Sequence, residues 1–226
     1  MTYADLVARL QAAIVEDPVS DDSWAVYLPA VIEQAELRCY RDCDFLAARK
    51  TVTSTLAQGV AQFAAPSDWL IGERVDLVIG GARTALLRRE DSFVREYGIV
   101  PGRPLYWSEP TQATLLVAPV PDSNYTIELS YHYRPTALGP SNTVTWLSSN
   151  VPDLLFYASM VAAAGYQKNF GAMADDPRSA LSWDHMYQTA LQSALREEGR
   201  RKGETTFDHS PSPQPSSSIP ATSSQG

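Results

Sequence analysis

The spacing of apolar residues along the chain changes twice, and these changes mark three regions. Apolar residues recur every three or four positions over 3–14 and again over 24–40, which predicts two amphipathic helices. Thr2 can cap the first helix. Pro29 lies within the second, where it removes a backbone donor, and we expect it to kink the helix or to begin its second part. The first region is therefore predicted to be helical.

The middle region has the two-residue period of β-strands. Val52, Ser54 and Leu56 alternate with threonines, and Gly80-Gly81 between apolar runs predicts a hairpin. The residues 90–98, "EDSFVREYG", are expected to form a short helix. Further strands are expected over 69–79, 84–87, 105–108, 114–117 and 125–133. The last of these places five apolar or aromatic side chains on one face, which is typical of an antiparallel sheet with one buried face.

Helical spacing returns in the third region. Asn150 can cap a helix that runs from about residue 152 to 170, and a final helix is expected from Asp176-Pro177 to about Gly199. The first of these helices is apolar over most of its circumference, which indicates burial on several sides and favours contact with neighbouring subunits as well as with its own core. Its candidate subunit contacts are Leu154, Tyr157, Val161 and Tyr166.

The composition changes again at Gly203, where the chain becomes rich in proline and serine. Such a segment buries too little apolar surface to offset its ordering entropy, so residues 203–226 are predicted to be disordered until they order on a partner. The predicted fold class is α+β: a helical bundle formed by residues 1–45 and 150–202, with an inserted antiparallel β-rich module at 46–149.

Charge and cysteine content narrow the function. The 226-residue chain has a net charge of -8 and 44% hydrophobic residues, so it does not have the charge of a general nucleic-acid binder. The one dense basic cluster ends the final helix, where cations complement the helix dipole; it consists of Arg196, Arg200, Arg201 and Lys202. Cys39 and Cys43 are two potential ligands where a structural zinc site usually needs four, so we expect reduced cysteines, no metal and no cofactor.

No motif for catalysis stands out in the sequence. Glu90 and Asp91 are adjacent acids at a helix start, where the helix dipole explains them, but a cell-wall glycan hydrolase would need two such carboxylates to converge. A carbohydrate-binding module would need Trp107 and Tyr131 as an exposed stacking platform. The residues 1–10 lack the pattern of a signal peptide, and no apolar run approaches the ~20 residues of a membrane span, so no membrane association is expected.

The order of the segments resembles one family, the head-to-tail adaptor (connector) proteins of tailed bacteriophages. Leu28–Phe45, "LPAVIEQAELRCYRDCDF", is similar to a family pattern of apolar-Pro-x-x-Ile-x-x-Ala-Glu followed by Arg-Asp. A threonine-rich stretch then leads to "APSDWL" at Ala65–Leu70. "SFVREYG", "GRPLYW", the strand sequence at Thr114–Leu138 and "NVPDLLFYASMVAAAGYQKN" at Asn150–Asn169 follow in the family's order. The two cysteines and the proline-rich tail depart from the pattern.

The resemblance implies a non-enzymatic structural protein of the virion neck, made in the host cytoplasm. It would form a ring of twelve copies between the portal and the tail or nozzle, and leave a channel through which DNA passes without sequence-specific binding. We expect the basic end of the final helix and the tail after it to contact the portal; the candidate residues are Arg196, Arg200, Arg201, Lys202 and Phe207.

Overall fold

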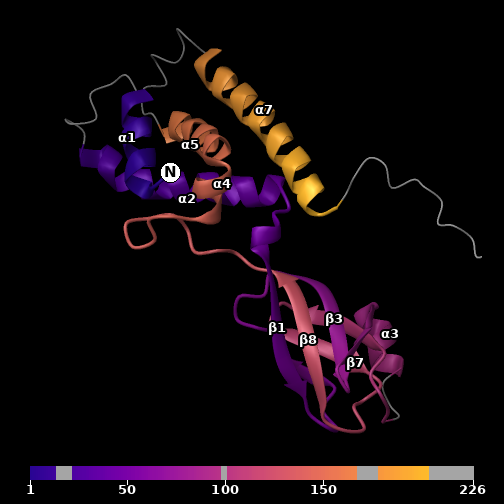
Figure 1. Cartoon of the computed structure of the whole chain (residues 1–226). Helices are drawn as coiled ribbons and strands as arrows, with labels where there is room; N and C mark the ends of the chain where they lie inside the picture. The colour runs from indigo at the N-terminus through magenta and orange to yellow at the C-terminus, as the bar shows by residue number, and fades with distance from the viewer. Residues whose placement is uncertain (14–21, 98–100, 167–177, 204–226) are drawn as a thin grey trace, which may run out of the picture.

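The computed structural model describes residues 1–13, 22–97, 101–166 and 178–203, and shows an elongated molecule with a helical part and a β-module (Figure 1). The helical part contains segments from both ends of the described chain. The β-module contains the middle of the sequence and is attached at the start of its first strand and the end of its last. Each part has its own cluster of buried apolar side chains, so the α+β class is confirmed.

The helical part contains α1 (Tyr3–Ala13), α2 (Asp22–Asp42), α4 (Trp146–Asn150), α5 (Pro152–Tyr166) and α7 (Arg178–Arg201). α5 packs against α2 on one side and α7 on another, and it also contacts α1 and α4. Thr2 caps α1, because its Oγ1 accepts from the Asp5 backbone N–H at 3.2 Å while its own N–H donates to the Asp5 carboxylate. α2 continues through Pro29.

The start of α5 differs from the expectation. Asn150 does not cap it; it ends the separate short helix α4, and its side-chain amide donates to the Trp146 carbonyl at 3.0 Å. The cap of α4 is Thr145, whose hydroxyl accepts from the Ser148 N–H while the Ser148 hydroxyl accepts from the Thr145 N–H. Ser148 performs the role of the Glu or Gln that usually completes this motif, and the sequence reading therefore missed α4.

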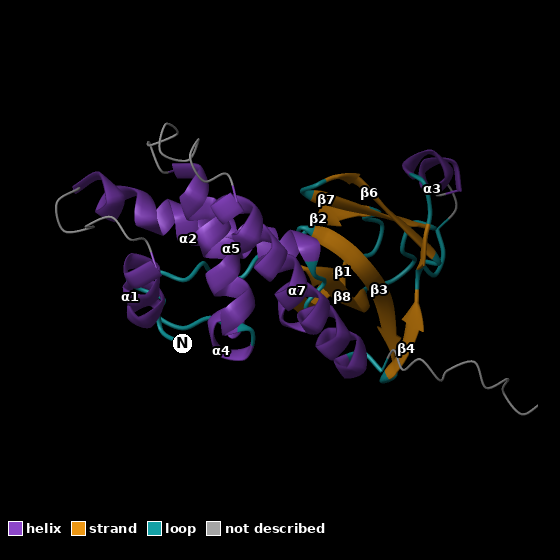
Figure 2. Ribbon diagram, turned by 90° about the horizontal axis from the view of Figure 1, so that it is seen from above, coloured by secondary structure: helices purple, strands orange, loops and turns teal. Residues whose placement is uncertain are grey.

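The β-module is a sandwich of two four-stranded sheets with one helix outside it (Figure 2). One sheet has the order β1-β8-β3-β4 and the other β2-β7-β6-β5. A turn of 3-10 helix at Leu46–Ala48 leads into β1. The strands are β1 (Arg49–Leu56), β2 (Gln62–Ala64), β3 (Ile71–Ile79), β4 (Ala82–Ala85), β5 (Leu87–Arg88), β6 (Tyr106–Thr111), β7 (Thr114–Ala118) and β8 (Tyr125–His132). α3 (Asp91–Tyr97) packs on β6 and β7.

Strand pairing follows the predicted alternation with one exception. β8 lies between β1 and β3, antiparallel to both, and its Ile127, Leu129 and Tyr131 face the interior. Gly80 and Gly81 join β3 to β4 with φ of 57° and 83°, a conformation that favours glycine at both positions. The exception is the pair β5 and β6, which is parallel because α3 lies between these strands in the chain.

The segment that follows β8 packs with the helices, although the sequence pattern grouped it with the β-module. Leu138 and Leu147 are both buried in the helical cluster. Tyr3 donates its backbone N–H to the Thr143 carbonyl at 2.9 Å, which ties this segment to α1. The change of core along the chain therefore comes soon after β8 and not at residue 149.

Candidate interaction surfaces

The acidic residue of the Ala-Glu pair in α2 holds the segment between β8 and α4. Glu36 is buried and accepts from the Leu138 backbone N–H at 2.7 Å and from the Thr145 hydroxyl at 3.0 Å. Burial raises the pKa of Glu36, and the two hydrogen bonds oppose that rise. Glu36 thus connects α2 to a segment more than 100 positions further along the chain, and its role is structural.

The Arg-Asp end of the same motif holds α7. Asp42 accepts from the Tyr187 hydroxyl at 2.7 Å, and burial together with this bond raises the pKa of Tyr187. Arg38 donates to Asp184 at 2.7 Å and lies 4.0 Å from the centroid of the Tyr187 ring. Both parts of the motif therefore fix the packing of the helices around α2.

A cluster of charged side chains joins the helical part to the β-module. Asp44 accepts from Arg49 at 2.7 Å and from Lys202 at 2.6 Å, and His132 Nδ1 lies 3.4 Å from it. Partial burial alone would raise the pKa of Asp44, but the hydrogen bonds from Arg49 and Lys202 lower it to about 2. Glu198, near the end of α7, accepts from the Leu46 N–H at 2.8 Å. The end of α7 is therefore bound to the chain just before β1.

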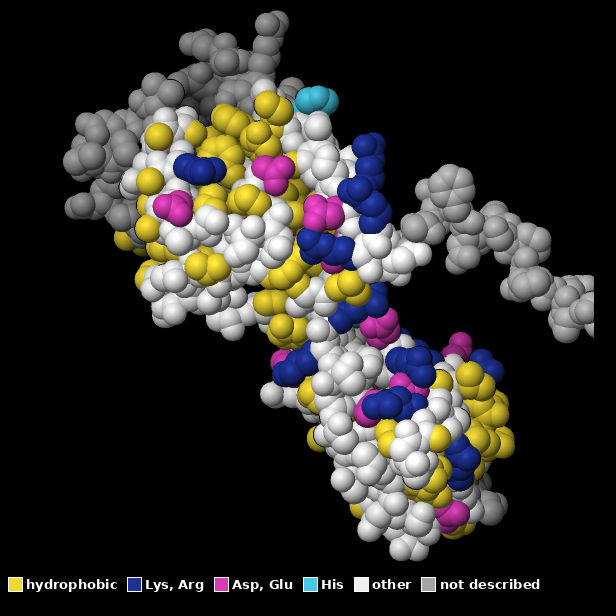
Figure 3. Space-filling model, viewed as in Figure 1, with side chains coloured by type: hydrophobic (Ala, Val, Ile, Leu, Met, Phe, Trp, Pro, Cys, Tyr) yellow, Lys and Arg dark blue, Asp and Glu magenta, His cyan; other side chains and the backbone are white. Residues whose placement is uncertain are grey.

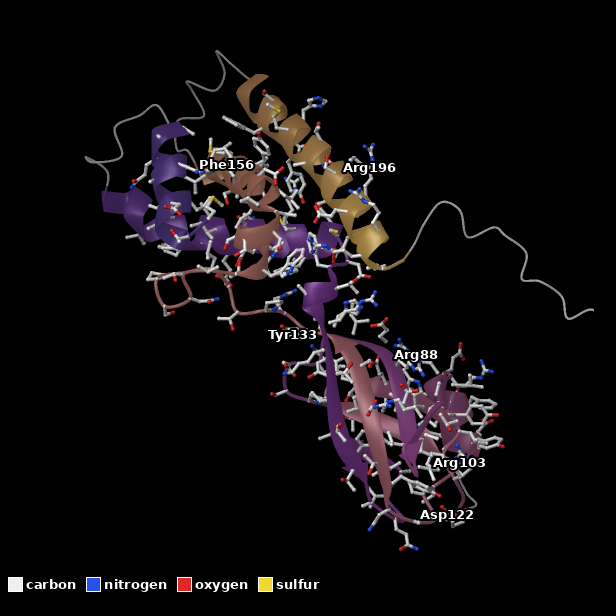
Figure 4. The ribbon with its side chains drawn as sticks, in the orientation of Figure 1. Arg88, Arg103, Asp122, Tyr133, Phe156 and Arg196 are labelled. Carbon is white, nitrogen blue, oxygen red and sulfur yellow. The ribbon has the colours of Figure 1, made fainter. Side chains whose placement is uncertain are left out.

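This junction divides the predicted portal-binding cluster into two pairs. Arg201 lies over the Trp146 ring, 5.1 Å from its centroid, and is ion-paired with Glu197, while Lys202 contacts Asp44. Arg196 and Arg200 are exposed, and no carboxylate in the described part of the chain pairs with either; Figure 4 shows Arg196 projecting from α7. Arg196 and Arg200 are therefore the members of the cluster whose charge no carboxylate of the described residues pairs. Phe207 lies outside the described residues.

The predicted subunit contacts on α5 divide in the same way. Leu154 has no exposed surface and belongs to the chain's own core, which leaves none of its side chain for a neighbouring copy. Tyr157 and Val161 are half-buried, and the side chain of Tyr166 lies outside the described residues. The Tyr157 ring centroid lies 5.6 Å from that of Phe156, its neighbour in α5, and 6.3 Å from that of Trp183 in α7. Figure 3 shows hydrophobic side chains exposed over this side of the helical part.

A groove between α2 and α5 extends this apolar area. The groove has a volume of about 530 Å³ and a wide mouth that leaves it open to solvent. Its apolar lining comes from Ala35, Ala158, Val161 and Ala162, and its polar lining from Gln34, Arg38, Arg41 and Asp42. An open groove of mixed apolar and charged lining suits contact with another protein surface better than enclosure of a small molecule.

The geometry favours neither of the two alternative functions, carbohydrate binding and glycan hydrolysis. Trp107 is 1% exposed and Tyr131 is 0% exposed, so these rings cannot form a carbohydrate-stacking platform. Three carboxylates do line one shallow depression, those of Glu90, Asp91 and Glu109. Asp91 is ion-paired with Arg95, and Glu109 is held by Arg88, Trp69 and the Gly72 N–H. These bonds account for Asp91 and Glu109 as structural residues.

One exposed surface was missed in the sequence. Phe93 and Tyr97 project from α3 with stacked rings 5.6 Å apart, and both rings meet Tyr106 of β6 edge-on. Leu87 and Leu105 are exposed beside Tyr106. The signal was available, because aromatic residues four positions apart in a predicted helix share one face. We call these five residues the α3 patch.

The described residues contain no cluster of three or more metal-binding side chains, and none of the helices described has the length and apolar character needed to cross a bilayer. The sequence model of the SU10 adaptor protein family matches residues 1–210. The chain belongs to this family. No curated protein matches the sequence. Because the match extends from α1 past the end of α7, it covers both parts of this adaptor.

Family membership confirms the resemblance to phage head-to-tail adaptors that the order of motifs indicated. The adaptor is a structural protein of the phage virion, its family implies a place in the virion neck, and the family is not a known enzyme class. The surfaces that matter for such a protein are those that meet other proteins: the exposed arginines of α7, the side of α5 and the α3 patch.

Proposed function

We propose that this adaptor assembles into a ring of twelve copies between the portal and the tail or nozzle, around a channel for DNA. The observation that carries the proposal is the family match over residues 1–210. Identical subunits commonly assemble with closed cyclic symmetry, in which each copy makes the same contacts with its neighbours, and such a ring leaves a central opening.

The ring contact is proposed to lie on the side of the helical part where α5 is exposed. Tyr157 and Val161 are half-buried there, beside Phe156 and Trp183. Burial of apolar surface contributes about 25 cal/mol per Å², and aromatic residues are enriched in interfaces. A neighbouring copy that covers these side chains would complete the burial that the all-round apolar character of α5 predicts.

The portal contact is proposed to involve the exposed arginines of α7 and the tail that follows it. Arg196 and Arg200 carry charge that the described part of the chain does not pair. Residues 203–226, with Phe207 near their start, would order on the portal surface, which allows a short segment to cover a large area. The chain's net charge of -8 suits a channel, since a negative wall repels the DNA backbone.

The experiment is assembly of purified adaptor on purified portal, measured by light scattering and native mass spectrometry. Deletion of residues 203–226 is expected to weaken portal binding while leaving the melting temperature of the body unchanged. The double variant R196E/R200E should weaken binding too, whereas R9E/R134E, which makes the same charge change at two other exposed arginines, should not. Unchanged assembly of the truncated protein would refute the role given to the tail.

The absence of a catalytic role is also proposed and has its own test. Purified adaptor is expected to leave peptidoglycan intact in a zymogram, alone and in complex with portal. Clearing of the gel that disappears in the variant E90Q/D91N would contradict the proposal, because those two carboxylates line a surface depression together with Glu109.

A further inference from the structure

The α3 patch belongs to the β-module, where Figure 3 shows hydrophobic side chains gathered on the surface. Four of its side chains are 40% to 53% exposed: Leu87, Phe93, Tyr97 and Leu105. Tyr106 lies between them, because it contacts both aromatic rings of α3 and is paired with Leu87 across the strands. A grouped set of large apolar side chains, unlike single ones, marks a binding surface.

The patch has the chemistry that recognises proline-rich segments. Proteins bind extended, proline-containing peptides on surfaces of neighbouring aromatic rings, because the prolines are already held in an extended helix and lose little entropy on binding. The rings of Phe93 and Tyr97 are stacked, with an interplanar angle of 19°, and Tyr106 stands nearly perpendicular to both. The patch is therefore a surface of neighbouring aromatic rings of the kind that such peptides bind.

The chain contains such a peptide in its own tail. Pro211, Pro213 and Pro215 alternate with polar residues, and Pro220 follows. The first part of the tail also carries Glu204 and Asp208. Two arginines of the β-module that lie close in sequence to patch residues, Arg89 and Arg103, are exposed and form no ion pair in the described part of the chain. Figure 4 shows Arg103.

The tail also begins at a favourable place. Lys202 contacts Asp44 at 2.6 Å, so the tail leaves α7 at the junction with the β-module. The 23 residues from 204 to 226 span about 70 Å in an extended proline-type helix at about 3.1 Å per residue. Tethering of this kind gives a local concentration in the millimolar range, which makes weak contacts effective. We propose that the proline-rich tail of the adaptor binds the α3 patch of its own chain.

This proposal concerns the free subunit and does not depend on ring formation or on portal binding. The experiment uses the full-length chain with Ser218→Cys, labelled with a photo-activated cross-linker. Cys39 and Cys43 are both buried, so the new thiol is the one that reacts. Cross-linked peptides are identified by mass spectrometry.

Most cross-links are expected to fall between residues 87 and 106, and their yield should not change on a dilution of about tenfold, since the contact is within one chain. Replacement of both aromatic residues in F93S/Y97S should lower that yield by about fivefold or more, as expected for the loss of about 1 kcal/mol. V26S removes a more exposed apolar side chain, 75% exposed, from the helical part, and it should leave the yield unchanged.

F93S/Y97S could also act by disturbing α3, so a second variant changes the tail and leaves α3 as it is. Replacing Pro211, Pro213 and Pro215 by alanine leaves the body intact and should lower the yield as much as F93S/Y97S does. Cross-links that lie mainly outside 87–106, that persist in both variants, or whose yield falls in proportion to dilution would overturn the proposal, and the last result would assign the patch to a tail from another copy.

Discussion

Replacing Glu36 by alanine should lower the stability of the adaptor more than replacing a surface residue of α2 does. The carboxylate is buried in the helical part and accepts two hydrogen bonds, from the Leu138 N–H at 2.7 Å and the Thr145 hydroxyl at 3.0 Å. Alanine leaves both donors buried without an acceptor. Each such group costs about 1–3 kcal/mol.

Part of that cost is offset, because the variant no longer buries a carboxylate whose pKa is raised by desolvation. The net loss is expected to be about 2–4 kcal/mol of unfolding free energy. Glu36→Gln retains one acceptor oxygen and its amide can donate to the Thr145 oxygen, so its cost should be smaller, about 1 kcal/mol. Glu33→Ala removes an exposed carboxylate from the same helix and should stay within about 0.5 kcal/mol of wild type.

The assay is urea denaturation followed by tryptophan fluorescence, with hydrogen exchange of the Leu138 amide as a local measure. The pH dependence has a definite sign. A carboxyl whose pKa is raised in the folded state favours folding most below its unfolded value of 4.5, so wild type should gain stability relative to Glu36→Gln as the pH falls toward that value. An alanine variant as stable as Glu33→Ala, with unchanged exchange at Leu138, would refute the role of Glu36.

Three further changes give separate outcomes. Gly72→Ala should cost about 1–3 kcal/mol in a denaturant titration, because the added carbon would clash with Glu109 Oε1 and with a Trp69 ring atom. No loss of stability would mean that these two side chains move aside without cost. Wild type should lose stability between about pH 4 and 2, the window between the unfolded pKa of Asp44, 3.8, and its folded value of about 2. Asp44→Asn should not show this loss, and equal acid sensitivity of the two proteins would contradict the ion pairs of Asp44 at the junction. Leu154→Ala should cost about 2–5 kcal/mol in the free subunit, since Leu154 is fully buried there. An unchanged melting curve would contradict that burial and would favour a place for Leu154 on the subunit surface.

Most of the fold could be predicted because the pattern of apolar residues follows backbone geometry. The alternation from 125 to 133 identified the central strand of its sheet, and Gly80-Gly81 identified a hairpin that requires positive φ at both positions. Thr2 was recognisable as a cap because its partner lies three residues away. These features depend on near neighbours in the sequence, which a reader of the sequence can see.

Features that depend on distant residues were not predictable in this way. Glu36 reads as one more acid in an amphipathic helix, but its partners lie more than 100 positions away. The basic cluster reads as uniform, yet contacts with Trp146 and Asp44 occupy Arg201 and Lys202 and leave Arg196 exposed. How far α5 is covered by its own chain depends on packing that sequence spacing does not encode, so Leu154 was predicted as a subunit contact together with its half-buried neighbours.

The central claim is that this adaptor is completed by copies of itself on the portal. Electron cryo-microscopy of purified adaptor mixed with purified portal tests it most directly. The account predicts an annulus of twelve adaptor copies coaxial with the portal, with the exposed side of α5 covered by the neighbouring copy. Portal particles that carry no such annulus at saturating adaptor, or a ring in which the α5 side faces solvent, would contradict it.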